Sequence, residues 1–533
     1  MFHQLLTPVN DNLTLSFLAA FLPIGVVLVL LGIVKRPAWQ ASMAGLVTAL
    51  AIAIFVWKLP AEFAVESTFA GAVFALWPIM WIVVNGLVLY NIAVLSGRFD
   101  AFKRWVILHL PNDRRVILVV IGFCFGALLE GIAGFGTPIA ITSSLLIMLG
   151  FEPIDAVVYT LIFDTAPVAF GALGVPVTTL AAVTGLHDTQ LGAMIGRQLP
   201  FFALLLPTYA VAMYAGLKSV RALWPVLLVA GASFALAQFL TSNYSGYALT
   251  DVVASLVSLL ATVGFLKLWQ PKPDPAYAVQ SPAELAPVRS DVPVWQAWLP
   301  WGIVSAVVIV WTIGKVALIG QMAIAWPALH NGIFITLYGK PYAAIWSFQP
   351  LATGTAILVA CILTALCVGL GFKGYIQAVR LTWIQARLAI LTVMTIIGMS
   401  YLINYSGMAY TLGFAVASAG AFFPLVSAFL GWLAVFLSGS DTSGNALFGN
   451  LQVVAARQLH YNPILFAASN SSGGVMGKMI SPQNVSTGCS TTALKGKEGL
   501  VLAKTFFHSI ALTLLLGILV WLQQFVWPWM IPQ

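Results

Sequence analysis

The chain has 533 residues, of which 60% are hydrophobic and only 8% are charged. Soluble globular proteins carry roughly a quarter charged residues, so this composition excludes a water-soluble fold. Four cysteines without a CxxC pair exclude a disulfide scaffold, and the abundance of apolar residues excludes disorder. The formal net charge of +8 comes from scattered Lys and Arg rather than from a basic stripe, so nucleic-acid binding is not expected. The composition indicates an all-α polytopic membrane protein.

The apolar runs predict about 12–14 transmembrane helices, at roughly 20 residues for each crossing. The first run is followed by Lys35-Arg36 rather than by a small-residue cleavage site, so we expect it to remain as a helix. Several runs are too long, or too rich in Gly and Pro, for one simple helix. In chain order the runs are 13–34, 40–57, 69–95, 114–150, 153–183, 199–217, 222–240, 248–268, 297–320, 352–371, 383–403, 410–437, 442–492 and 500–527.

Basic residues between the runs predict the orientation in the membrane. Cytoplasmic loops are enriched in Lys and Arg. Two predicted helices separate Lys35-Arg36 from the densest basic segment, so both are expected on the cytoplasmic side and the N-terminus outside. That segment contains Arg98, Lys103, Arg104, Arg114 and Arg115.

Residues 269–296 are rich in Pro and polar side chains, which is typical of a linker. They divide the chain into an N-terminal membrane half, 1–268, and a C-terminal half, 297–533. The stretch 321–350 mixes aromatic and polar residues and is expected to be an extramembrane or interfacial loop.

The apolar runs of the two halves are interrupted at corresponding places, which indicates an internal repeat. Glu130 lies 33 residues beyond Gly97, and Asp441 lies 34 residues beyond Gly407. Each carboxylate falls in a Gly/Ser/Thr-rich interruption of an apolar run, and a second interruption follows in each half. We therefore predict two inverted repeats with broken helices or re-entrant hairpins. The site regions are 123–183, with interruptions at 130–138 and 164–176, and 438–492, with interruptions at 438–445 and 470–482.

Unwound backbone at membrane depth is tolerated only where it is buried in protein or lines a wet cavity. Freed helix N-termini offer N–H donors that suit a small carboxylate, and glycines permit close approach of the ligand. The alternative is that the glycines serve close helix packing and the prolines simple kinks. The residues expected to bind substrate are Gly134, Gly136, Thr137, Thr165, Thr442, Ser443, Asn445, Ser472, Lys478 and Gln483.

Three carboxylates, Glu130, Asp164 and Asp441, lie inside apolar runs. An ionised carboxylate at the bilayer centre costs about 2.5–3.5 kcal/mol or more, so these residues are candidates for proton coupling. A structural ion pair, or hydrogen bonds to freed backbone N–H groups, is the alternative. Lys478 is the candidate cation, either for a substrate carboxylate or to neutralise Asp441. The histidines show no metal-ligand spacing, so neither a metal nor another cofactor is expected.

Enzymatic motifs are incomplete. Gly473 to Lys478 resembles a phosphate-binding loop, but the spacing is short and Met479 replaces the Ser or Thr that binds magnesium. The sequence has no HExxH, and Ser440 and Ser443 lack the flanking pattern of a nucleophile elbow. An intramembrane enzyme is therefore a weak alternative.

At these same residues the chain resembles the bacterial lactate permease family, over nearly its whole length. The resemblance implies a secondary transporter of L-lactate, usually also of D-lactate and glycolate, that moves with protons across the bacterial inner membrane. It also implies membership of a broad group of ion transporters with inverted repeats and re-entrant hairpins, which often work by an elevator motion. The stretches that carry it are 123–131, 133–136, 165–171, 196–200, 404–407, 439–443, 445–448 and 477–483.

Two residues depart from the family pattern. Asp164 stands where Asn is common, which bears on proton stoichiometry, and Gly444 stands where Ser is common. A carrier for another small carboxylate, such as gluconate or a dicarboxylate, and a cation/proton antiporter remain open alternatives. Oligomeric state does not follow from the sequence.

Overall fold

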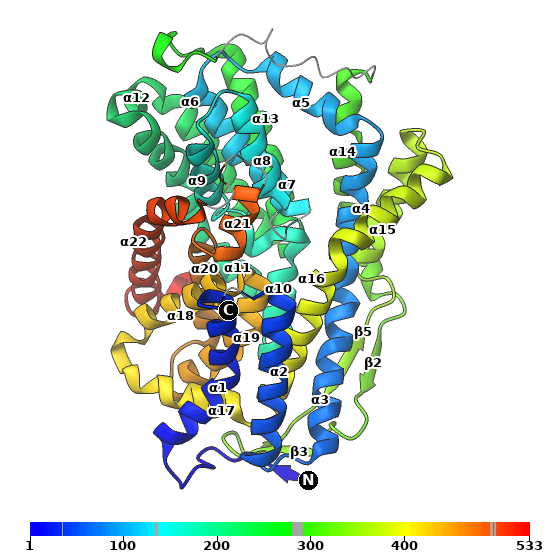
Figure 1. Cartoon of the computed structure of the whole chain (residues 1–533), viewed down its shortest axis with the longest axis vertical. Helices are drawn as coiled ribbons and strands as arrows, with labels where there is room; N and C mark the ends of the chain where they lie inside the picture. The colour runs from blue at the N-terminus through cyan, green and yellow to red at the C-terminus, as the bar shows by residue number, and fades with distance from the viewer. Residues whose placement is uncertain are drawn as a thin grey trace.

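The chain is almost entirely helical (Figure 1). The computed structural model describes residues 1–34, 36–132, 134, 137–279, 292–490, 494 and 497–532. Within these residues, nine helical segments are long and apolar enough to cross a membrane, or ten if one bent pair counts as a span. The prediction of a mostly helical polytopic membrane protein is therefore confirmed.

These segments are fewer than the about 12–14 helices predicted from span length. Some apolar runs form shorter helices, and the runs 199–217 and 222–240 are two arms of one segment, α12 (Leu199–Leu240). The backbone of α12 turns at Gly216, where φ is +76°. The arms pack closely, because a Cβ on Gly231 would lie 2.4 Å from the carbonyl oxygen of Leu204. One long segment thus contains two predicted helices.

One group of helices brings the two halves of the chain together (Figure 1). A Cβ on Gly71 would lie 2.6 Å from the carbonyl oxygen of Ile397, so backbones from both halves touch. The predicted halves therefore interlock here. The group consists of α2 (Ala38–Phe55), α3 (Ala61–Phe74), α4 (Trp81–Leu95), α14 (Leu299–Ile313), α15 (Thr353–Cys367) and α16 (Phe372–Ser406).

A second group holds the broken helices. Helix α1 (Leu13–Gly32) packs against both groups, and α5 (Arg98–His109) leads from the first group to the second. From the first half the second group takes α6 (Arg114–Ile117), η2 (Leu118–Phe125), α7 (Gly126–Ile132), α8 (Thr137–Met148), α9 (Pro153–Phe163), α10 (Gly171–Thr184), α11 (Asp188–Ile195), α12 and α13 (Thr250–Leu268). From the second half it takes α17 (Met408–Val416), α18 (Phe423–Ser438), α19 (Asp441–Gln458), α20 (Pro463–Lys478), α21 (Pro482–Ser490) and α22 (Glu498–Phe525).

The prediction of an all-α fold is wrong in the stretch 321–350, which contains short strands. Aromatic and β-branched residues there favour strands over helix. Strand β1 (Phe2–His3) pairs in parallel with β3 (Ile333–Ile335), which pairs antiparallel with β4 (Lys340–Pro341). A separate antiparallel pair is formed by β2 (Met322–Ala325) and β5 (Ile345–Phe348). The N-terminus is thereby tied to this stretch.

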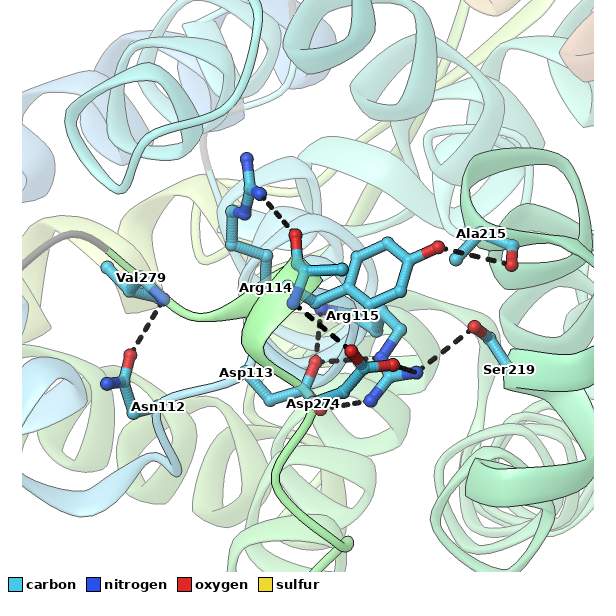
Figure 2. A network of polar contacts seen from close by, with 10 residues as sticks. Asn112, Asp113, Arg114, Arg115, Ala215, Ser219, Asp274 and Val279 are labelled. Carbon is cyan, nitrogen blue, oxygen red and sulfur yellow. Dashed lines mark hydrogen bonds and ion pairs between the residues drawn. The ribbon is translucent and has the colours of Figure 1, made fainter.

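The described start of the predicted linker is anchored to the N-terminal half (Figure 2). The guanidinium of Arg115 donates to both carboxylate oxygens of Asp113, at 3.0 and 2.7 Å, and to Asp274 at 3.3 Å. It also lies 4.4 Å from the ring centroid of Tyr277 and donates to the Ser219 hydroxyl. The linker therefore begins as an ordered segment held beside the turn of α12. Residues 280–291 of the predicted linker lie outside the described residues.

Candidate functional site

Two helix breaks, one from each half, meet at one small cavity. Helix α7 ends at Ile132, Gly134 has a φ of +53°, and α8 follows. In the second half α18 gives way to α19 through Gly439, with a φ of +73°, and Ser440, whose side chain caps α19. The cavity measures about 40 Å³. Since a buried water needs roughly 10–15 Å³, the cavity suits a ligand of a few heavy atoms. Its walls are Glu130, Gly134, Val168, Gly171, Ala172, Pro176, Gly439, Ser440, Asp441, Thr442, Lys478 and Gln483.

The start of α10 completes the wall with an unusual backbone. Ala172 and Leu173 have φ angles of +44° and +57°, a left-handed conformation that non-glycine residues rarely adopt. Such residues cost about 1–3 kcal/mol each and cluster at functional sites. At Gly171, a Cβ would lie 2.8 Å from Oε1 of Glu130, so only glycine lets this backbone approach the carboxylate.

A buried ion-pair cluster joins the two halves. Lys478, at the end of α20, places its Nζ 2.8 Å from Oε1 of Glu130 and 2.9 Å from Oδ2 of Asp164. All three side chains are at most 5% exposed. These charges are therefore buried rather than at the surface. Removing one member of such a cluster leaves the remaining charges buried without a counter-charge, which is strongly destabilising. Lys478 thus balances carboxylates of the first half rather than Asp441 alone.

Asp441 has neutral hydrogen-bond donors instead. The hydroxyl of Ser471 donates to its Oδ2 at 2.6 Å, and Nδ2 of Asn445 donates to the same oxygen at 3.3 Å. Among the described residues, Oδ1 of Asp441 has no hydrogen-bond partner. The network continues inward, because Asn470 donates to Oδ1 of Asn445 and receives a bond from Gln452. Asp441 is therefore held in place at the cavity wall by uncharged groups.

The structure brings most of the predicted site residues together. Glu130, Gly134, Asp441, Thr442, Lys478 and Gln483 line the cavity. Asp164 and Asn445 do not line the cavity but contact residues that do: Asp164 pairs with Lys478, and Asn445 donates to Asp441. Ser443 lines the adjoining cavity described below.

Two predicted residues point elsewhere. The hydroxyl of Ser472 donates to Gln198 at 2.7 Å, and that of Thr165 donates to the carbonyl of Ile162 at 2.7 Å. Gly136 and the side chain of Thr137 lie outside the described residues.

The second interruption of the C-terminal half is shorter than predicted. Helix α20 continues to Lys478, so the break falls at 479–481 instead of beginning at 470. The glycines in this stretch serve helix packing: a Cβ would lie 2.1 Å from the carbonyl oxygen of Ala428 at Gly473, and 2.2 Å from that of Trp432 at Gly477. The close-packing interpretation therefore holds for these two glycines.

A second, larger cavity of about 820 Å³ adjoins the first, since Ser440 and Gln483 line both. Its wall extends to Arg36 and Trp39 at the α1–α2 turn and to Glu498 at the start of α22. The small cavity therefore adjoins a larger one that reaches the α1–α2 turn.

Sequence reasoning missed one buried acid beside the site, Asp251 in the first turn of α13. Its side chain is 0% exposed. The residue lies near the start of the apolar run 248–268, where a charged residue is usually interpreted as marking the end of a membrane span. Its position inside that run, three residues after the start, is the feature of the sequence that could have indicated burial.

Broken apolar helices that hold buried charges around a small cavity define a secondary membrane transporter. The model of the L-lactate permease family matches residues 16–527, and the chain belongs to this family. The expected resemblance is therefore confirmed. Because the family is one of permeases, the chain is a transporter and not an enzyme.

Two relatives match over almost their whole length. The chain is 40% identical to the L-lactate permease of Bacillus subtilis (strain 168), over 99% of each chain. It is 41% identical to the glycolate permease GlcA of Escherichia coli (strain K12), over 98% of each chain. The fold is similar to that of MtrF from Neisseria gonorrhoeae, described among antimetabolite efflux pumps, at 14% identity and a TM-score of 0.50 over 94% of this chain and 97% of that one.

Proposed function

We propose that the chain takes up L-lactate, and also D-lactate and glycolate, together with protons across the bacterial inner membrane. The observation that carries this proposal is a small cavity whose wall holds Lys478, a cation suited to a carboxylate, between two carboxylates. The names of the full-length relatives support lactate and glycolate as substrates. The volume of the cavity supports a small ligand over gluconate.

The substrate carboxylate binds at the N-terminus of α19, beside Thr442, and to Lys478. Helix N-termini attract anions through free N–H groups and the helix dipole. The α-hydroxyl then pairs with Asp441, Asn445 or Gln483, each of which can accept a hydrogen bond. Ser472 is the weaker candidate, because its hydroxyl already donates to Gln198.

Proton binding compensates the charge of the substrate. Moving an anion against a negative-inside potential costs about 2.3 kcal/mol per charge per 100 mV, which a co-transported proton offsets. Protonation of Glu130 frees Lys478 for the substrate, while Asp164 remains its counter-charge. Protonation of Asp441 has the same neutralising effect on the loaded site. The carrier then reorients only when substrate and proton are both bound or both absent.

The membrane orientation follows from the basic residues. Helix α2 and the α3–α4 segment lie between Arg36 and Arg98, which puts both at the cytoplasmic side and the N-terminus outside. The larger cavity opens beside Arg36, so this conformation faces the cytoplasm.

Two inverted repeats account for the order of elements around the site. The first half contains two breaks, one between α7 and α8 and one between α9 and α10. The second half also contains two, between α18 and α19 and between α20 and α21. All these helices belong to the second group, which suits its movement as one body against the first.

Uptake of labelled L-lactate into proteoliposomes with an imposed proton gradient tests the proposal. We expect accumulation inside when the outside is acidic, and its loss when a protonophore is added. Unlabelled D-lactate and glycolate should compete, and gluconate should not. Absence of accumulation would contradict the proposal, and pH changes on adding sodium without organic acid would indicate an antiporter instead.

A further inference from the structure

Asp251 lies directly behind the cavity wall. Its side chain is fully buried, and neither of its carboxyl oxygens has a hydrogen-bond partner among the described residues. It faces the back of α7, because a Cβ on Gly131 would lie 2.9 Å from its Oδ2. Asp251 is not among the described residues that line the small cavity.

Four buried carboxyl groups therefore surround the site, but they differ in their partners. Glu130 and Asp164 share the ammonium group of Lys478. Asp441 receives hydrogen bonds from Ser471 and Asn445. Asp251 receives neither a cation nor a hydrogen bond from the described residues.

The surroundings of Asp251 add no further cation. Among the described residues, the charged groups that act on it are Glu130 on α7, Asp164 at the end of α9 and Lys478 on α20. Two further titratable side chains, on η2 and in the turn before α13, have partners of their own: the Cys124 thiol contacts Ser258, and the Tyr247 hydroxyl donates to Asp188. An ionised carboxylate buried without donors costs several kcal/mol, so this environment favours the proton-bound acid.

Glu130 connects Asp251 to the cavity. It precedes Gly131, against which Asp251 packs, and it lines the small cavity. A proton that leaves the Asp251 carboxyl can therefore be taken up by the Glu130 carboxylate and released into the cavity.

We propose that Asp251 binds and releases one proton in each transport cycle, with Glu130 passing it to and from the cavity. This inference rests on the proposed function and deepens it, because it adds one proton to the coupling ratio. In the conformation described here Asp251 holds its proton. It gives the proton up when the site opens to the opposite side of the membrane.

The test compares wild type with Asp251→Asn in proteoliposomes. Lactate exchange between equal concentrations moves no net proton and reports on folding and substrate binding. The steady accumulation of lactate at set pH gradients and membrane potentials gives the number of protons per lactate. We expect exchange within about twofold of wild type, since Asp251 does not line the small cavity, and a ratio lower by one proton. Asp155→Asn is the matched control, because Asp155 forms a surface pair with Lys504 and should leave the ratio unchanged.

Each outcome is decisive. Absence of lactate exchange in wild type contradicts the proposed function itself. An equal ratio in wild type and Asp251→Asn, with exchange intact, overturns the role of Asp251 alone. If Asp251→Asn does not fold, Asp251→Ser replaces it, and Asp251→Glu should keep the full ratio. Failure of both neutral variants to fold, with Asp251→Glu folding, would assign the carboxyl to the fold instead.

Discussion

Glu130 and Asp441 each lie beside a helix break of their own half, yet their surroundings differ. Glu130 meets the ammonium group of Lys478 at 2.8 Å, whereas Asp441 meets the hydroxyl of Ser471 at 2.6 Å and an amide of Asn445. The Glu130 carboxylate is balanced by a full charge, and the Asp441 carboxylate only by dipoles. A proton that binds Glu130 therefore weakens an ion pair that ties the halves together, whereas Asp441 can gain and lose a proton without breaking an ion pair.

The two halves differ in how the backbone at the site is held. Helix α19 begins with a regular cap, since the Ser440 side chain accepts from the N–H of Ser443. The first-half site instead includes the left-handed residues Ala172 and Leu173. The second half thus presents a relaxed helix N-terminus, while the first presents strained backbone that packing must hold.

Removing the shared cation should have the largest effect. In Lys478→Met, Glu130 and Asp164 lose their counter-charge in a buried site, at a cost of about 3–5 kcal/mol. We expect a lower melting temperature in detergent and loss of both lactate exchange and gradient-driven uptake. The control is Lys504→Met, which removes a largely exposed pair with Asp155. Wild-type exchange in Lys478→Met would show that the cation does not bind substrate.

Asp441→Asn should separate exchange from coupling. Asparagine keeps the shape of the side chain and an oxygen for Ser471, so the protein should fold and exchange lactate. Because asparagine cannot take up a proton, pH-driven accumulation should fall by about tenfold for each unit of imposed pH difference, since one proton fewer is coupled to each lactate. Uptake should also depend less steeply on pH. Persistence of accumulation with unchanged pH dependence would show that Asp441 does not carry the proton.

Glu130→Gln should be milder than either change. Lys478 keeps Asp164 at 2.9 Å, and the glutamine oxygen can still accept from it. Removing the charge from this hydrogen bond costs about 1.5–3 kcal/mol, which should appear as a lower melting temperature and weaker lactate binding. Because glutamine cannot take up or pass a proton, the number of protons per lactate should also fall. The comparison with Asp441→Asn distinguishes the roles of the two carboxylates. If Glu130→Gln lost all exchange while Asp441→Asn had no effect, the roles proposed for the two carboxylates would be reversed.

The sequence predicts the membrane class, the paired interruptions and the residues Glu130, Asp441 and Lys478, because charges and broken apolar runs are local signals. It does not predict that Lys478 pairs with Glu130 and Asp164, since that contact joins residues more than 300 positions apart. Glycines that pack helices also resemble glycines that break them, so the second break was placed too early. The sequence does not predict the burial of Asp251, because neighbouring helices bury this residue and the apolar run that contains it does not.

The smallest effect is expected from relieving the strained backbone. Ala172→Gly removes one methyl group and allows the φ of +44° without penalty, which should raise the free energy of unfolding by up to about 1 kcal/mol. The gain in stability should come with weaker lactate binding, because a glycine loosens the wall opposite Gly134. A thermal melt and the KM for exchange measure the two effects together. Ala169→Gly is the matched control: Ala169 is buried in the helical turn just before this segment, at normal backbone angles, so the change there should only destabilise. If Ala172→Gly destabilises as much as Ala169→Gly, the backbone at the first-half site is not strained, and this difference between the two halves disappears.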